Sequence, residues 1–283
     1  MNALVLLFPG QGSQEPDMAA TVASLRPDLV ELAADAVGED PFARVGEGTR
    51  FDQPAIYCAA LAGLERLERP EADLYAGHSM GEITALAAAG ALSEEDGLRL
   101  VAERGRLMER VGAQTNGAML AVLVGRDEAA AVAERHGLAV ANDNAPSQVV
   151  LSGPLDAIEA AEAEAGEQDM RVKRLPVAGA FHSPLMADAV EPFVATVREV
   201  ELRAPRAPVY SCVTAAPFED VPGSLSEALV EPVRWVEVLH ALHEAGGRRF
   251  IETGPGKVLA GLVRKTLDDV EVTAPKPAEA ASA

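Results

Sequence analysis

Residues 73–89 read DLYAGHSMGEITALAAA, and this stretch decides the fold of the chain. Asp73–Ala76 has the apolar and aromatic content of a short buried strand, and Glu82–Ala89 is rich in alanine, as a helix would be. Between them, Gly77-His78-Ser79-Met80-Gly81 fits the pattern G-x-S-x-G. A strand, a tight glycine turn and a helix in this order predict an α/β protein with a serine at the turn.

This glycine turn has the chemistry that acyl transfer needs. Glycines at 77 and 81 let the backbone bend sharply and expose the Ser79 hydroxyl. The helix that follows places its positive end and the Met80 N–H beside that hydroxyl, where an oxyanion would form. The alternative is a turn with a purely structural role. The strand before the pentapeptide and the helix after it make this alternative weaker than it would be for the pentapeptide alone.

A second glycine loop follows the apolar run Leu4–Phe8, which reads as another buried strand. The loop is Pro9-Gly10-Gln11-Gly12-Ser13-Gln14. If the two strands lie parallel in one sheet, the loops at their carboxyl ends face each other, which is where ligands bind in open α/β sheets. The Gln11 N–H is then a candidate for the second oxyanion donor, and a plain glycine turn is the alternative.

A serine hydroxyl is a weak nucleophile, so a base must reach it. The chain has five histidines, at positions 78, 136, 182, 240 and 243, and the last two lie in an amphipathic stretch. His182 is the candidate base because it lies in the loop VAGAFHSP, 177–184, where a smaller domain returns to a larger one. An ordinary α/β-hydrolase has an Asp and then a His near its C-terminus, and no such pair is evident. The residues alone leave a surface role for His182 open.

The helical stretch 98–110 has four arginines, at positions 99, 104, 106 and 110. An arginine that points inward could bind a substrate carboxylate through two parallel hydrogen bonds. The residues alone do not say which of the four that would be.

The pattern between 115 and 176 differs from the rest of the chain. Strand and helix signals alternate there in the order β-α-β-β-α-β, at 118–124, 126–135, 139–142, 148–151, 155–167 and 171–177. This order predicts a small ferredoxin-like domain. We expect it, over 115–182, to be inserted in a large α/β-hydrolase-like domain with a parallel sheet, over 1–114 and 183–274. The low-complexity end, 275–283, is expected to be disordered.

Composition excludes several classes of protein. The 283 residues have a formal net charge of −20, which argues against nonspecific nucleic-acid binding. Two cysteines, Cys58 and Cys212, lie far apart and in no metal-binding spacing, which fits a reducing cytoplasm. The run Leu4–Phe8 is too short to span a membrane and lacks the basic start of a signal peptide. We therefore expect a cytoplasmic protein with no metal, no membrane partner and no nucleic-acid partner.

Four motifs in order resemble those of the malonyl-CoA:acyl-carrier-protein transacylases and of the acyltransferase domains of polyketide synthases. They are FPGQGSQ at 8–14, GHSMGE at 77–82, FHSP at 181–184 and GPGKVL at 254–259. The resemblance extends from about residue 4 to residue 266. It implies an acyltransferase that moves a malonyl group from malonyl-CoA to the phosphopantetheine thiol of an acyl carrier protein, with a serine nucleophile and no bound cofactor.

The resemblance also implies a role for each matching position. Ser79 matches the nucleophile, His182 the base, and Gln11 and Met80 the donors of the oxyanion hole. Arg104, in Glu103-Arg104-Gly105-Arg106, matches the arginine that binds the malonyl carboxylate.

Two further positions match supporting residues. Asn144 looks like the polar residue beside the cleft. The backbone carbonyl of Arg234, in Pro232-Val233-Arg234-Trp235, matches the acceptor that orients the histidine, so that no triad aspartate is needed.

Substrate choice is expected to depend on Phe181 and His78. Ala180-Phe181-His182 resembles the malonyl-selecting type, in which the aromatic ring crowds an α-methyl branch. Excluding a methyl group is worth only about 1–3 kcal/mol, so the selectivity should leak. Gly179 stands where integrated polyketide domains often have a histidine, which favours a freestanding enzyme.

The pathway, fatty acid or polyketide synthesis, stays open, and we expect a monomer. An acidic carrier protein would need a basic patch, for which the candidates are Arg171, Lys173, Arg174, Arg248, Arg249, Lys257, Arg264 and Lys265. One alternative function is an acyl-thioester hydrolase on the same fold. Another is a carrier-binding scaffold without activity.

Overall fold

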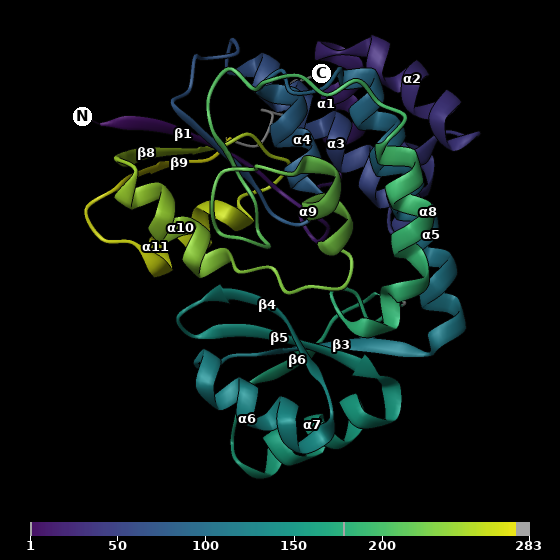
Figure 1. Cartoon of the computed structure of the whole chain (residues 1–283), viewed down its shortest axis with the longest axis vertical. Coiled ribbons are helices and arrows are strands. Elements are labelled where there is room, and N and C mark those ends of the chain that lie inside the picture. Colours follow the sequence, from purple (N-terminus) through teal and green to yellow (C-terminus); the bar gives the residue numbers. More distant parts are fainter. Residues whose placement is uncertain (1, 178, 276–283) are drawn as a thin grey trace, which may run out of the picture.

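The computed structural model describes residues 2–177 and 179–275, and Figure 1 shows them as two layered parts. Within this range, the larger part is built on a five-stranded sheet in the order β7-β2-β1-β8-β9. Its strands are β1 (Ala3–Phe8), β2 (Leu74–Gly77), β7 (Val209–Tyr210), β8 (Gly247–Glu252) and β9 (Glu271–Thr273), and every neighbouring pair is parallel. The predicted α/β class with a parallel sheet is confirmed.

Helices cover both faces of this sheet. The helices on one face are α1 (Met18–Leu25), α2 (Pro27–Val37), α3 (Thr49–Arg66), α4 (Gly81–Ala88), α5 (Glu94–Thr115) and α8 (Ala187–Val197), and those on the other are α10 (Trp235–Glu244) and α11 (Val258–Thr266). Leu6 and Phe8 of β1 point into the first group, and Val5 and Leu7 point into the second. Because both faces are covered, the strand reads as a continuous apolar run.

The smaller part is a four-stranded antiparallel sheet in the order β4-β5-β3-β6. Its elements are β3 (Gly117–Val122), α6 (Arg126–His136), β4 (Ala139–Ala145), β5 (Gln148–Pro154), α7 (Leu155–Glu167) and β6 (Val172–Arg174). Leu120 and Leu151 pack against α6 and α7, while Met119 and Val150 belong to the apolar cluster of the larger part. The ferredoxin-like order is confirmed, whereas the predicted domain boundaries stay a prediction. The disordered tail predicted for 275–283 lies, apart from Pro275, outside the described residues.

Local interactions set the ends of three elements. Arg26 separates α1 from α2, because a proline disfavours helical geometry in the residue before it. Helix α3 begins at Thr49 and includes Pro54. Strand β7 ends at Tyr210, since the Cys212 N–H is bound by the Glu82 carboxylate instead of a neighbouring strand.

The remaining elements are short connections. They are the 3-10 helices η1 (Pro41–Arg44) and η2 (Pro184–Met186) and the helix α9 (Val221–Glu227). In the part of the chain that the structure describes, no helix has the length and hydrophobicity needed to cross a membrane.

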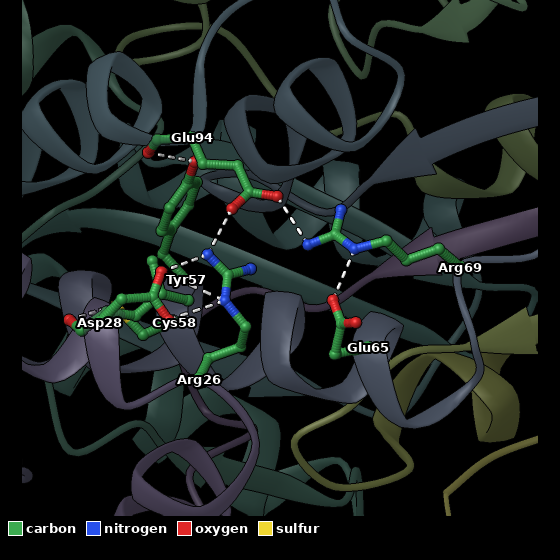
Figure 2. A network of polar contacts seen from close by, with 8 residues as sticks. Arg26, Asp28, Tyr57, Cys58, Glu65, Arg69 and Glu94 are labelled. Carbon is green, nitrogen blue, oxygen red and sulfur yellow. Dashed lines mark hydrogen bonds and ion pairs between the residues drawn. The ribbon is translucent and has the colours of Figure 1, made fainter.

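A network of ion pairs and hydrogen bonds connects helices of the larger part (Figure 2). Arg26, between α1 and α2, contacts Asp28 at 2.6 Å and Glu94, at the start of α5, at 2.8 Å. Glu94 also accepts from Arg69, which lies just after α3. The Tyr57 hydroxyl of α3 donates to the Glu94 carbonyl at 2.8 Å. The network therefore joins the junction of α1 and α2 to α3 and to the start of α5.

Candidate active site

Ser79 lies at a strained turn between β2 and α4. Its φ of +55° is in the left-handed region, which residues other than glycine rarely adopt. The flanking glycines are required by close approach: a Cβ on Gly77 would lie 1.9 Å from the Gly81 carbonyl oxygen, and one on Gly81 would lie 2.2 Å from that of Phe8. The turn therefore has the geometry that the sequence pattern predicts for an exposed nucleophile.

His182 reaches this turn from the loop before η2. Its Nε2 lies 2.8 Å from the Ser79 Oγ, although 103 residues separate the two in the chain. Its Nδ1 lies 3.2 Å from the backbone carbonyl oxygen of Glu231. With Nδ1–H donating to that carbonyl, Nε2 has a free lone pair directed at the serine hydroxyl.

The acceptor predicted for this histidine was wrong. We expected the Arg234 carbonyl, but that oxygen accepts from the Val238 N–H in the first turn of α10. Because helix α10 begins at Trp235, the carbonyl of the preceding residue is used inside the helix. The Glu231 carbonyl, three residues earlier, lies outside the helix and is free to accept from His182.

Arg104 contacts the serine from the other side. Of the four arginines of α5, a helix described throughout, only Arg104 is buried, with 2% of its surface exposed. Its Nη2 donates to the Ser79 Oγ at 3.0 Å and its Nη1 to the Gln53 Oε1 at 3.1 Å. The guanidinium is therefore beside the reacting oxygen and held by an amide of α3.

Burial sets the charge states of these groups. Desolvation, assisted by the nearby Arg104 charge, lowers the pKa of His182 to about 3. The imidazole is therefore neutral at pH 7 and can accept a proton. Desolvation also lowers the pKa of Arg104 to about 10, which leaves the guanidinium charged at pH 7.

The two loops expected to form the oxyanion hole lie side by side. β1 and β2 pair in parallel up to Phe8 and Gly77, and a Cβ on Gly10 would lie 2.5 Å from the His78 carbonyl oxygen. The backbone N–H groups of Gln11 and Met80 donate no hydrogen bond to any residue that the structure describes. They are thus available to a ligand oxygen, and their role as oxyanion donors stays a prediction.

The Gln11 side chain is anchored away from the serine. Its Nε2 donates to Thr49 and Asp52 at 3.2 and 3.1 Å. These three residues line one end of a cavity of about 350 Å³ whose other wall is the chain between β6 and His182. The cavity lies beside the candidate site, between the two parts of the molecule.

His78 and Asn144 form a contact between the two parts. The His78 Nε2 lies 2.7 Å from the Asn144 Oδ1 on β4, and the His78 ring meets the Trp235 ring edge to face at 5.3 Å. Phe181 is 5% exposed and packs in the larger apolar cluster. The structure therefore brings Asn144 to the turn, while the selectivity roles of His78 and Phe181 stay predictions.

Three residues at the site carried no assigned role in the sequence. They are Gln53, Glu82 and Glu231, which contact Arg104, the Cys212 N–H and His182 respectively. Only Glu82 had a signal in the sequence, since it is the last residue of the motif GHSMGE at 77–82. In the described part of the chain, no group of three or more His, Cys, Asp or Glu is placed to hold a metal.

The eight basic residues proposed for carrier docking lie in or next to three elements, β6, β8 and α11. Arg174 on β6 and Arg249 on β8 are paired with glutamates of their own surroundings. Lys265 of α11 donates to Gln148, the first residue of β5. Arg171 and Lys173 are exposed on the smaller part. A single basic patch does not follow from these contacts, and the docking role stays a prediction.

Known proteins resemble the chain along nearly all of its length. Residues 5–281 match the model of the acyl transferase domain family. The polyketide biosynthesis protein ThaF of Burkholderia thailandensis is 44% identical over 92% of this chain and 24% of its own length. The polyketide biosynthesis malonyl CoA-acyl carrier protein transacylase PksC of Bacillus subtilis is 36% identical over 95% of this chain and 98% of its own.

Solved structures also resemble it over nearly its whole length. The malonyl CoA-acyl carrier protein transacylase of Coxiella burnetii has a TM-score of 0.89 at 31% identity, covering 96% of this chain and 93% of its own. A type II polyketide carrier protein in complex with its malonyl-transacylase has the same TM-score at 28% identity, covering 97% and 96%. The chain spans about a quarter of ThaF and just over a third of the polyketide biosynthesis protein PksE of Bacillus subtilis.

Proposed function

The chain belongs to the acyl transferase domain family, and we propose that it moves a malonyl group from malonyl-CoA to the phosphopantetheine thiol of an acyl carrier protein. One observation carries the proposal. The Ser79 Oγ lies 2.8 Å from a neutral imidazole and 3.0 Å from a buried guanidinium, so that a nucleophile, a base and a carboxylate-binding cation meet at one atom.

Acylation follows from this geometry. The malonyl carboxylate binds Arg104, and the His182 Nε2 takes the Ser79 proton as Oγ attacks the thioester carbonyl. The N–H groups of Gln11 and Met80 stabilise the tetrahedral oxyanion. The carbon–sulfur bond then breaks, the coenzyme A sulfur takes the proton from His182, and a malonyl ester stays on Ser79.

Transfer to the carrier reverses these steps. The phosphopantetheine thiol gives its proton to the His182 Nε2 and attacks the ester carbonyl. The carbon–oxygen bond breaks and the proton returns to the Ser79 oxygen. The reaction is therefore ping-pong, with a covalent intermediate between two half-reactions.

Arg104 favours a carboxylated acyl group over acetyl, because a buried cation without a carboxylate partner is costly. The Phe181 ring is proposed to disfavour an α-methyl branch. Arg104 is also the reason to prefer transfer over the hydrolysis of bulky acyl chains, which bring no carboxylate to the site.

One relative supports a polyketide pathway. The polyketide biosynthesis protein ThaF is 44% identical, whereas the malonyl CoA-acyl carrier protein transacylases of Bacillus subtilis and Haemophilus influenzae are 36% and 33% identical. The higher identity to ThaF supports a carrier protein of a polyketide synthase as the acceptor. We further propose a monomer that acts in the cytoplasm.

A transfer assay tests the proposal. The protein is mixed with malonyl-CoA and a phosphopantetheinylated carrier protein, and malonyl-carrier, free malonate and free coenzyme A are quantified. We expect malonyl-carrier to account for the coenzyme A released. Free malonate in its place would make the protein a hydrolase, and carrier binding without coenzyme A release would make it a scaffold.

A further inference from the structure

Glu82 is a buried carboxyl group that the acyl-transfer steps do not use. It lies in the first turn of α4, three residues after Ser79, and 1% of its surface is exposed. Glutamate is almost never fully buried unless its oxygens are paired. Its partner is the Cys212 N–H, which donates to Oε1 at 2.6 Å.

Cys212 connects the nucleophile turn to a second segment of the active site. Its N–H binds Glu82, and its thiol lies 3.1 Å from the Gly77 carbonyl oxygen at the end of β2. Its own carbonyl accepts from the Arg234 N–H at 3.0 Å. All three polar groups of this residue are therefore bound to segments that flank the reacting pair.

The segment that includes Arg234 also includes the carbonyl that orients His182. Glu231 supplies that carbonyl. Two residues later, Val233 forms two backbone hydrogen bonds with the edge strand β4. Its N–H donates to the Ala141 carbonyl and its carbonyl accepts from the Asp143 N–H, each at 2.9 Å. The segment is thus fixed between Cys212 on one side and β4 on the other.

These contacts close a ring. From the Ser79 hydroxyl the ring passes to His182, to the Glu231 carbonyl, along the backbone to Arg234 and across to Cys212. From Cys212 it passes to the Glu82 carboxylate, and the Glu82 N–H donates to the Ser79 carbonyl at 3.0 Å. We propose that Glu82 is a positioning residue, whose carboxylate fixes the distance between the nucleophile and the base through Cys212.

The charges around Glu82 fit this role. Arg104 on α5 stabilises the carboxylate across the site, while its guanidinium donates to Gln53 and Ser79. The donors of Arg104 therefore stay available to Ser79 and to a substrate. Burial raises the pKa of Glu82 to about 7, opposed by the Cys212 N–H and by Arg104.

The test compares Glu82→Gln and Glu82→Ala with a matched control, Glu252→Gln. Glu252 is also buried and also accepts backbone N–H groups, those of Leu259 and Ala260, but it lies outside the ring. Single-turnover acylation of Ser79 by malonyl-CoA is measured at rising substrate concentration, together with the melting temperature. The inference rests on the proposed function of Ser79 and His182.

We expect the limiting acylation rate to fall about tenfold in Glu82→Gln and about a hundredfold in Glu82→Ala, since a misplaced reacting pair loses on the order of a hundredfold. Half-saturation by malonyl-CoA should stay within about twofold, because the ring does not bind substrate. Glu252→Gln should keep the wild-type rate at temperatures where it is folded.

The pH profile adds a readout that a structural role would not change. In the wild type the rate should fall as pH drops through about 7, because protonation of Glu82 weakens its bond to Cys212. The other titratable groups near Glu82 keep the same charge around pH 7 and so do not explain this fall in rate. Burial lowers the pKa of His182 to about 3, leaves Arg104 charged and raises the pKa of the Cys212 thiol. The fall in rate between pH 8 and pH 6 should be absent in Glu82→Gln.

The outcomes separate the two proposals. A wild type that forms no malonyl ester overturns the proposed function, and the positioning role falls with it. A wild type that forms the ester overturns the positioning role alone if Glu82→Gln and Glu82→Ala acylate at its rate, or if Glu252→Gln is slowed as much as Glu82→Gln.

Discussion

Arginine and glutamate occur in two settings in this molecule. In the network of Figure 2, Arg26 and Glu94 touch at 2.8 Å. Hydrogen bonds to Asp28 and Glu94 raise the pKa of Arg26. Burial alone would raise the pKa of Glu94, but Arg26 and Arg69 outweigh it and lower that pKa. At the candidate active site the shifts are reversed. Burial lowers the pKa of Arg104 to about 10 and raises that of Glu82 to about 7.

The difference separates structural from functional charge. Charges that are directly paired favour their ionised forms and hold helices together. Arg104 and Glu82 are buried without an ion-pair partner, which disfavours their charged forms, as is common for perturbed groups in active sites. The guanidinium of Arg104 thereby stays available to a substrate carboxylate. The comparison predicts that neutral replacements affect the two regions in opposite ways.

The largest effect is expected for His182→Ala. Without the base, the acylation rate should fall about 10⁴-fold or more. The measurement is release of coenzyme A from malonyl-CoA in the first turnover, with the melting temperature as a control for folding. A folded variant that retains more than about a tenth of the wild-type rate would contradict the assigned base.

Arg104→Met should lower the specificity constant for malonyl-CoA roughly 300-fold. The variant leaves the bound malonyl carboxylate without its cation, and removing one partner of a buried charge pair costs roughly 2–5 kcal/mol. The rate with acetyl-CoA should change little, so the preference for malonyl is lost. Competition between the two thioesters measures this directly. The melting temperature should not fall, since an apolar side chain of similar volume replaces an unpaired buried charge.

Glu82→Gln should gain stability relative to the wild type as pH rises from 5 to 8, by at most about 3 kcal/mol. A carboxyl group whose folded pKa is raised contributes stability below its unfolded pKa, and that stability is lost as pH rises through about 7. Urea unfolding of both proteins at several pH values measures the difference. A constant difference across this range would show that Glu82 is not strained by burial.

The smallest effect is expected for Arg26→Met, the counterpart of Arg104→Met in the network. It removes partly exposed pairs with Asp28 and Glu94 and should cost about 1 kcal/mol of unfolding free energy. The acylation rate should stay at the wild-type value. An Arg26→Met variant that is more stable than the wild type would remove the distinction between the two regions.

Much of the fold was predictable because periodicity and glycine turns are local signals. The apolar run before Pro9 and the G-x-S-x-G turn after Ala76 indicated two buried parallel strands, and the order of elements after residue 115 indicated the smaller sheet. Helix periodicity also carried a signal for Arg104 that the sequence analysis did not use. At 100° per residue Arg104 lies on the apolar face of its helix, whereas Arg99, Arg106 and Arg110 lie together on the opposite face.

The contacts made through the backbone were not predictable in the same way. A carbonyl acceptor has no residue-specific signal, so Arg234 was expected where Glu231 lies. The bond between Glu82 and Cys212 joins residues 130 positions apart and depends on where β7 ends. Such details are set by tertiary packing rather than by local pattern.

The central claim is that Ser79, activated by His182, carries the malonyl group. Intact-mass spectrometry after brief mixing with malonyl-CoA, in the absence of a carrier protein, tests it most directly. We expect one malonyl addition on the wild type, none on Ser79→Ala, and loss of the addition when a phosphopantetheinylated carrier protein is added. An unmodified wild type that still transfers malonate to the carrier would contradict the covalent mechanism.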